Sequence, residues 1–131
     1  MGKMQREKGK RGEREVCKLL EQYGFSAHRS RQSSGAIDPD VVVDADLWVE
    51  VKFVQRIAAE RFLEQAESDT KDGLTPVVFM RSNGGQWMTL CRATQLPDLA
   101  RIIDERVSHE QKTHTTDAPV QESPNDSESE Q

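Results

Sequence analysis

Apolar residues recur at intervals of three and four in three stretches of the chain, and this spacing predicts three helices. The first helix is expected over about residues 11–23, the second over about residues 58–71 and the third over about residues 96–107. Gly24 directly follows the first stretch, at the position where a glycine commonly ends a helix.

Between these stretches lie short runs predicted as strands, of which residues 41–43 and 47–54 are rich in the β-branched and aromatic residues typical of strands. The predicted strands cover about residues 25–30, 41–43, 47–54, 77–81 and 86–91. Residues 44–46 join the second strand to the third, and Asn83-Gly84-Gly85 joins the last two, so two hairpins are expected. The fold class is therefore α/β: a small mixed β-sheet flanked by helices, in the order α-β-β-β-α-β-β-α.

Charge is spread unevenly along the 131 residues, although the formal net charge is only −5. Residues 1–31 carry nine Lys and Arg against four Asp and Glu, a balance of +5, whereas residues 109–131 carry six acids and one Lys, a balance of −5. The acidic stretch has almost no apolar residues with which to offset its ordering entropy. We therefore expect a flexible basic arm over residues 1–10, one domain over residues 11–108 and a disordered acidic tail over residues 109–131.

The composition narrows the class of protein. The basic N-terminal third favours nucleic acid as the partner, although a charged surface that only faces solvent would explain it equally well. The longest apolar run is far shorter than the ~18 residues of a membrane-spanning helix, and Met1–Lys18 lacks the apolar core of a signal peptide. Cys17 and Cys91 are too few for a disulfide framework, so a reducing cytoplasm is the expected compartment.

The hairpin of residues 41–54 brings possible chemistry together. A three-residue connection pairs Val41 with Val49, and the next step of the ladder places Asp40 opposite Glu50. Opposed side chains have Cβ atoms only about 4.5–5.5 Å apart, so like charges there are destabilising. Lys52 shares a face with Glu50 because alternate strand residues do. A hard cation such as Mg²⁺ would relieve the repulsion, since it prefers carboxylate oxygens.

Alternatives remain for each of these residues. A Glu-x-Lys triplet is common by chance and also suits the polar face of an exposed hairpin. Asp38 faces Lys52 in the same register, so a salt bridge between them is expected. Glu13 shares the apolar side of its helix with Val16, which suggests a paired or metal-binding carboxylate; a glutamate favoured by the helix dipole is the alternative.

A succession of short motifs then resembles a known family. It is made up of Gly12-Glu13-Arg14-Glu15, Gly24-Phe25, His28-Arg29-Ser30, Ser34-Gly35, Pro39-Asp40 and Glu50-Val51-Lys52. In this order the motifs resemble the PD-(D/E)xK nuclease superfamily, most closely the archaeal-type Holliday junction resolvases and their small phage-encoded relatives. The resemblance covers about residues 8–92. The spacing from Asp40 to Glu50 is a few residues shorter than in the archaeal enzymes.

The resemblance implies a catalytic and metal-binding role for four side chains. Asp40 and Glu50 correspond to the acids that bind Mg²⁺, for which Mn²⁺ is expected to substitute, and the backbone carbonyl of Val51 would add a ligand. Lys52 corresponds to the lysine that positions or deprotonates the attacking water and stabilises charge on the phosphate. Glu13 corresponds to a helix glutamate that reaches the metal, often through water.

Other residues are expected to contact DNA. Arg29 corresponds to a basic residue that holds a phosphate, and Ser34 to a loop serine near the scissile strand. Lys8, Lys10, Arg11 and Arg14 would supply phosphate contacts without sequence preference.

Three further residues have weaker assignments. Gln65 loosely matches a glutamine of related nucleases, although a solvent-facing helix residue is the preferred interpretation. Trp48 and Trp87 could stack on bases, but packing is the default expectation for both.

These observations predict a restriction-endonuclease-like domain acting as a Mg²⁺-dependent DNA endonuclease. It would be structure-selective for four-way (Holliday) junctions or other branched DNA, in recombination or repair. A homodimer is implied, because a junction has twofold symmetry and one short chain supplies one site. The rivals are a flap or duplex nicking or repair nuclease of the same fold, and a non-catalytic DNA-binding module. The resemblance implies a bacterial or phage origin.

Overall fold

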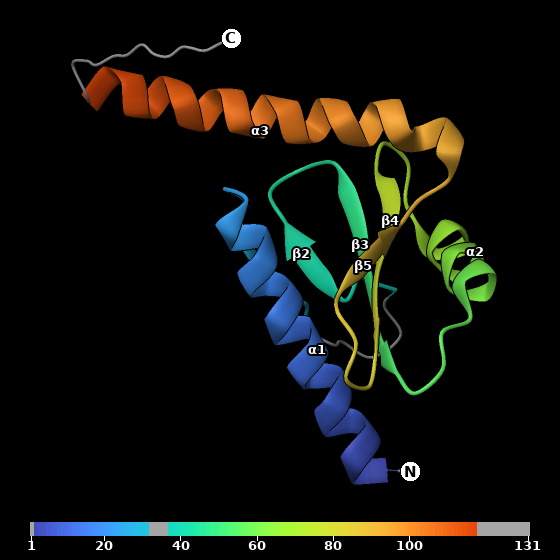
Figure 1. Ribbon diagram of the computed structural model, residues 1–131. Helices are drawn as coiled ribbons and strands as arrows, with labels where there is room; N and C mark the ends of the chain where they lie inside the picture. Colours follow the sequence, from blue (N-terminus) through green and yellow to red (C-terminus); the bar gives the residue numbers. More distant parts are fainter. Residues whose placement is uncertain (1, 32–36, 118–131) are drawn as a thin grey trace, which may run out of the picture.

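The sequence order of helices and strands is confirmed in the computed structural model, which describes residues 2–31 and 37–117, with side chains as far as Val107. The elements are α1 (Gly2–Gln22), β1 (Ala27–Arg29), β2 (Val41–Val43), β3 (Leu47–Val54), α2 (Ala59–Asp69), β4 (Thr75–Ser82), β5 (Met88–Leu90), a short 3₁₀ turn η1 (Ala93–Gln95) and α3 (Leu96–Asp117). Figure 1 shows a small mixed sheet with helices around it, so the predicted fold class is confirmed.

The five strands form one sheet in the order β1-β2-β3-β4-β5. Neighbouring strands are antiparallel except β3 and β4, which are parallel and joined through α2. Val41 lies opposite Val49, as the three-residue connection predicts. This register fixes where the polar residues just beyond β2 meet those in the middle of β3.

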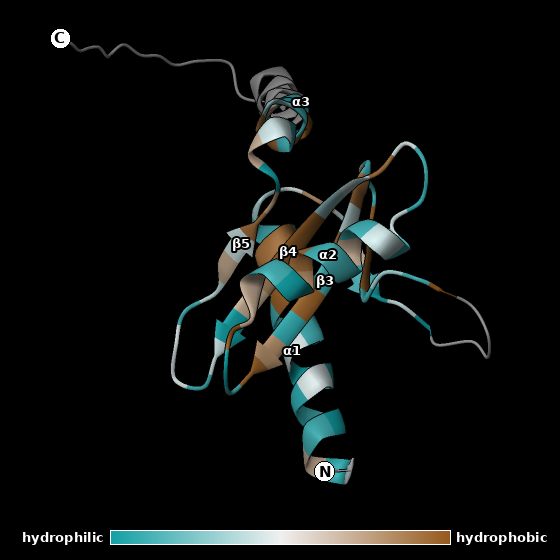
Figure 2. Ribbon diagram, turned by 90° about the vertical axis from the view of Figure 1, so that its right-hand side faces the viewer, coloured by the Kyte–Doolittle hydropathy of each residue, from teal (hydrophilic) through white to brown (hydrophobic). Residues whose placement is uncertain are grey.

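Strand β3 lies at the centre of the sheet, and both of its faces are covered. Val49 and Val51 join Val16 of α1 and Ile102 of α3 in one core cluster. Trp48 joins the other cluster with α2 residues, among them Phe62. Trp48 is 1% exposed, so the packing interpretation of this residue is confirmed. Figure 2 shows the apolar β3 and β4 between more polar helices.

Two helices extend further than the sequence predicts. Helix α1 begins at Gly2 rather than near Arg11, so residues 2–10 are its first turns and not a separate arm. Helix α3 continues to Asp117, so residues 109–117 are helical where a disordered tail is expected. The prediction followed apolar spacing, whereas the start of α1 is rich in Lys, Arg, Glu, Gln and Met, which form helices well without a buried face. Residues 118–131, the rest of the expected tail, lie outside the described residues.

Close packing holds α1 against the sheet. A Cβ atom on Gly12 would lie 3.0 Å from Cβ of Phe53 and 3.4 Å from the ring of Trp87, so a larger residue does not fit without movement. At the other end, Gly24 has a φ of +95° and follows the last turn, as predicted. No helix of residues 2–31 and 37–117 is long and apolar enough to cross a membrane.

Candidate active site

Asp40 lies just before β2 and is held by backbone contacts on both sides of Glu50. Its amide donates to the carbonyl of Val49 (3.0 Å). Its Oδ2 accepts a hydrogen bond from the amide of Val51 (2.8 Å). The carboxylate thus takes an amide that a neighbouring strand would otherwise bond, which places it beside Glu50 as the sequence predicts.

Glu50 is a buried carboxylate in the middle of β3, with 8% of its side chain exposed. Burial and the charge of Asp40 raise its pKa to about 7, although Lys52 acts in the opposite direction. Burial also raises the pKa of Asp40, and the charge of Glu13 adds to this against the bond from Val51. A cation bound beside Asp40 and Glu50 would therefore strongly favour the charged form of both carboxylates.

Lys52 lies on the same face as Glu50, as expected from the alternation of the strand. Its Nζ is 3.6 Å from Oε2 of Glu50 and donates a hydrogen bond to Oε1 of Gln65 (3.0 Å). Gln65 is exposed, as its preferred interpretation as a solvent-facing helix residue expects, and it also accepts this hydrogen bond from Lys52. The expected salt bridge from Asp38 is wrong, because Lys52 pairs with Glu50 and Asp38 is exposed.

Glu13 of α1 forms an ion pair with Arg29 of β1, with 2.9 Å between Oε1 and Nε. Its charge reaches Asp40, whose pKa it raises. The inward orientation expected for Glu13 is supported, since only 18% of its side chain is exposed. The roles expected for Glu13 at a metal and Arg29 at a phosphate remain predictions. Ser34 lies outside the described residues.

The donors at this centre suit Mg²⁺. Mg²⁺ is typically held by one or two carboxylates, with water and substrate phosphate completing its shell. Asp40 and Glu50 are two carboxylates whose pKa values are raised by burial, and in Glu50 also by the charge of Asp40. Where side chains are described, no three His, Cys, Asp or Glu residues lie close enough to hold a metal by themselves. A cation at this centre would therefore be held by Asp40 and Glu50 together with oxygen atoms that do not come from side chains, such as those of water and substrate phosphate.

Comparison with known proteins gives the family. A family model described as archaeal Holliday junction resolvase (hjc) matches residues 4–123, which is most of the chain. The chain belongs to the archaeal Holliday junction resolvase family. This makes it a member of a family of nucleases, as the motifs of the sequence indicate.

This family member is also similar to a solved structure. A 1.6 Å structure of Archaeoglobus fulgidus Hjc, described as a Holliday junction resolvase from an archaeal hyperthermophile, is similar to it with 23% identity and a TM-score of 0.47. The similarity covers 63% of this chain and 75% of that one. No curated protein matches the chain.

In this resolvase-family chain, four of the five basic residues expected to contact DNA lie on α1, and the fifth, Arg29, lies on β1. Lys10, Arg11 and Arg14 are exposed and Lys8 is half-buried. Arg11 is paired with Glu15 one turn along the helix, with Nε 3.2 Å from Oε2. Their contact with DNA remains a prediction.

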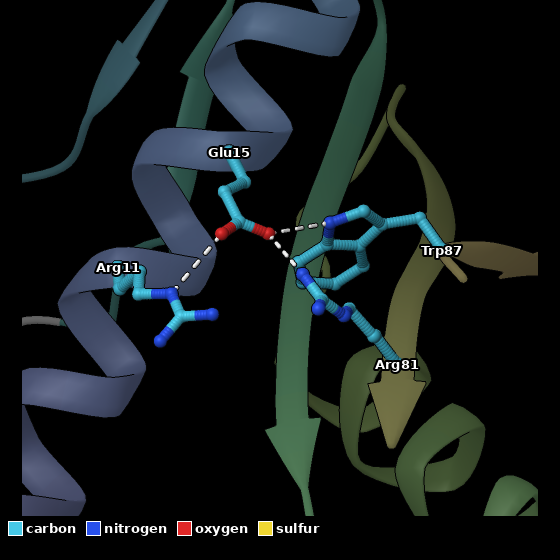
Figure 3. A network of polar contacts seen from close by, with 4 residues as sticks. All are labelled: Arg11, Glu15, Arg81 and Trp87. Atoms are coloured by element: carbon cyan, nitrogen blue, oxygen red, sulfur yellow. Dashed lines mark hydrogen bonds and ion pairs between the residues drawn. The ribbon is translucent and has the colours of Figure 1, made fainter. Parts of the chain in front are cut away.

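A polar network that the sequence does not indicate lies at the other side of α1. Glu15 accepts hydrogen bonds from Arg81 Nη1 (2.6 Å) and from Trp87 Nε1 (2.9 Å), besides its contact with Arg11 (Figure 3). Arg81 is the penultimate residue of β4, and Trp87 directly precedes β5. Because these partners are 66 and 72 residues from Glu15, no local pattern indicates the contact. The packing expected for Trp87 is confirmed by its edge contact with Phe53, whose ring centroid is 5.9 Å away.

Proposed function

We propose that this member of the resolvase family is a Mg²⁺-dependent endonuclease that acts as a homodimer and cuts four-way DNA junctions. The observation that carries the proposal is the contact of Glu50 with Lys52, at 3.6 Å, beside a second carboxylate, that of Asp40. A protein that only binds DNA has no need of two neighbouring carboxylates in a nearly buried place. Membership in the resolvase family supports the substrate.

The chemistry required is hydrolysis of a phosphodiester. Bound Mg²⁺ would lower the pKa of a coordinated water and polarise the phosphoryl oxygen. Asp40 and Glu50 would hold it, with the carbonyl of Val51 as a further ligand and Glu13 through water. Lys52 would place its ammonium near the attacked phosphate and stabilise the developing charge, and Gln65 accepts a hydrogen bond from that ammonium.

Substrate choice would depend on DNA shape rather than on base sequence. The basic side chains expected to contact DNA are Lys and Arg residues of α1 and Arg29 of β1, which suit phosphates and carry no direct sequence information. A four-way junction has two symmetric cleavage points, and each chain supplies one set of Asp40, Glu50 and Lys52. A homodimer would therefore present two centres to one junction.

Cleavage of a labelled four-way junction in Mg²⁺ tests the proposal. Wild type is expected to make paired symmetric cuts, and Glu50→Gln and Lys52→Ala to lose them by about a hundredfold or more while binding of the junction is retained. The matched controls are Glu64→Gln and Lys18→Ala, which change an exposed carboxylate of α2 and an exposed lysine of α1 and should cut normally.

The other outcomes point to other functions. Equal cutting of flaps or linear duplex by wild type, lost in the same two variants, would keep the nuclease and contradict the junction selectivity. Cutting that depends on Mn²⁺ alone would contradict the choice of Mg²⁺. Binding without cutting in either metal would contradict the enzyme and favour a DNA-binding module.

A further inference from the structure

One strip of residues along helix α1 contacts the sheet, and different residues lie on its two sides. Gly12 and Val16 face the sheet and are buried. Glu13 and Glu15 are two residues apart, about 200° around a helix, so they flank this strip on opposite sides. Glu13 contacts β1 near the candidate active site, whereas Glu15 contacts Arg81 at the end of β4.

An open groove of about 600 Å³ lies on the Glu15 side, between the first half of α1, the ends of β3 and β4, and the turn after β4. Its charged lining is Glu7, Lys8, Arg11, Arg14 and Arg81. No carboxylate among the described side chains pairs with Lys8 or Arg14. The groove is therefore basic.

Three of these cations lie close to the ring of Phe53. It is 9% exposed, and its centroid lies 5.0 Å from Nζ of Lys8, 5.1 Å from Cζ of Arg11 and 4.6 Å from Cζ of Arg81. Cations near an aromatic face are attracted to it. Three like charges so close together repel one another, so they need an anion to stay in this arrangement.

Glu15 is that anion, and it is fixed in place by Trp87. Its Oε1 accepts from both Arg81 and Trp87, and its Oε2 accepts from Arg11 (Figure 3). Burial opposes ionisation of Glu15, but the bonds from Trp87 and Arg11 and the charge of Arg81 outweigh it, so its pKa lies below the ordinary value. The carboxylate stays charged near neutral pH.

The network leaves donors for an outside acceptor. Arg81 donates a hydrogen bond to Glu15 from Nη1, and Arg11 donates one to Glu15 from Nε. Within the part of the chain that the structure describes, no acceptor takes a hydrogen bond from Nη2 of Arg81 or from either Nη of Arg11. A planar guanidinium held on one side offers its remaining donors in a fixed direction, which suits phosphate oxygens.

We propose that this groove binds a phosphodiester of the DNA backbone remote from the cleavage centre, and that Glu15 is the positioning residue that sets Arg11 and Arg81 toward it. The inference rests on the proposed function, since DNA is the ligand. It gives an acidic residue a favourable role in DNA binding, which is the opposite of what its charge alone predicts.

Two variants that remove the same charge from the same helix test the proposal. Glu7→Gln removes an anion that lines the groove, and Glu7 makes no ion pair with the described side chains; junction binding should tighten. Glu15→Gln removes an anion that holds two arginines, and binding should weaken by about three- to tenfold, in line with loss of hydrogen bonds to charged groups. Binding is measured without divalent metal, so that cleavage plays no part.

A double-mutant cycle shows whether Glu15 acts through Arg81. In an Arg81→Ala background, Glu15→Gln should cost little further affinity, because contacting residues are not additive. The salt dependence is a second readout: Arg81→Ala and Glu15→Gln should each lower the slope of log affinity against log salt by up to about one, the value for one phosphate contact. A residue that only stabilises the fold would not change this slope.

Thermal unfolding of every variant shows whether it is folded. If Glu15→Gln does not fold, Arg81→Lys takes its place; it keeps the charge but loses the planar donors, and it should also weaken binding. Tighter binding by Glu15→Gln, as for Glu7→Gln, or unchanged binding by Arg81→Lys, would overturn this inference alone. Failure of wild type to bind any DNA would overturn both this inference and the proposed function.

Discussion

At the scale of single residues, the pKa of Glu50 makes a prediction about stability. Its pKa rises from an ordinary 4.5 to about 7 in the folded protein. Between these values the folded state binds more protons than the unfolded state, so the free energy of unfolding falls as pH rises. Without divalent metal, Glu50 should therefore cost the wild type on the order of 2–3 kcal/mol between pH 5 and pH 8.

The comparison of wild type with Glu50→Gln isolates this effect from other titrating groups. Urea unfolding in EDTA at pH 5 and pH 8 should show the variant gaining stability relative to wild type as pH rises. Mg²⁺ at pH 8 should then stabilise wild type more than the variant, because only an intact site binds it well. An equal pH dependence of the two proteins would contradict the raised pKa.

Gln65 leads to a second residue-scale prediction, since it accepts a hydrogen bond from Lys52 at 3.0 Å. Gln65→Ala should lower the rate of junction cleavage by about three- to tenfold, with binding little changed, because Lys52 loses one of its two polar contacts. Gln65→Glu should keep Lys52 in place but add a negative charge beside it.

The control for Gln65 is its neighbour Glu64, which is exposed on the same helix. Glu64→Ala should cut junctions at the wild-type rate. Rates are measured under single-turnover conditions, so that binding and chemistry are separated. If Gln65→Ala changed affinity and left the rate of cutting unaltered, Gln65 would contact DNA rather than orient Lys52.

Residues of the candidate active site could be predicted from the sequence because they follow strand geometry. Asp40, Glu50 and Lys52 lie within one hairpin, and a short connection fixes its register. Glu15 was missed because both of its new partners come from the end of β4 and the residues before β5, more than sixty positions away. Local periodicity carries no information about such contacts.

At the scale of secondary structure, the close approach of the sheet to Gly12 leads to a prediction about the packing of α1. An alanine gains up to about 1 kcal/mol in helix propensity over glycine, whereas overpacking a filled interface costs about 1–3 kcal/mol. Cβ of Phe53 and the ring of Trp87 stand in the way of a new methyl group at Gly12. The overpacking cost should prevail, and Gly12→Ala should lower the unfolding temperature.

Gly9 supplies the matched control, because it lies on the same helix and a Cβ there would meet nothing within 4 Å. Gly9→Ala should raise the unfolding temperature, since only the propensity term remains. The two substitutions are chemically identical, so opposite signs would show the close approach of α1 to Phe53. A rise for both would contradict it.

The elements themselves were predicted better than their ends. Apolar spacing located α1, α2 and α3, and β-branched and aromatic residues located β2 and β3, because these patterns follow from which face is buried. The same spacing cannot locate a helix end whose sequence lacks recurring apolar residues. The predicted start of α1 and the predicted end of α3 are therefore wrong. Helix α1 begins at Gly2 and α3 ends at Asp117, both well beyond the last apolar positions used for the prediction.

At the scale of the whole molecule, the proposed homodimer predicts that a different chain makes each of the two cuts in a junction. Each chain contributes one Asp40, Glu50 and Lys52, so a junction held by two chains is cut once by each. Loss of Lys52 in one subunit should leave the partner's centre intact, because the residues of the centre come from within one chain. The number of cuts per binding event should then fall from two to one.

A cruciform plasmid makes this difference visible. Two cuts within one binding event give linear DNA, whereas one cut releases the supercoiling and gives a nicked circle. Mixed dimers of wild-type and Lys52→Ala subunits, carrying two different affinity tags and purified through both, should give nicked circles. Wild-type dimers prepared with the same two tags should give linear DNA, and their mass in solution by light scattering should be that of two chains.

Each contrary result identifies a different error. A wild-type mass of one chain, together with nicked circles as its main product, would contradict the homodimer but leave the nuclease. Linear DNA from the mixed dimers at the wild-type rate would mean that one centre makes both cuts. Loss of all cutting in the mixed dimers would mean that each centre depends on Lys52 of both chains, contrary to the intrachain contacts that hold Lys52 beside Glu50 and Gln65.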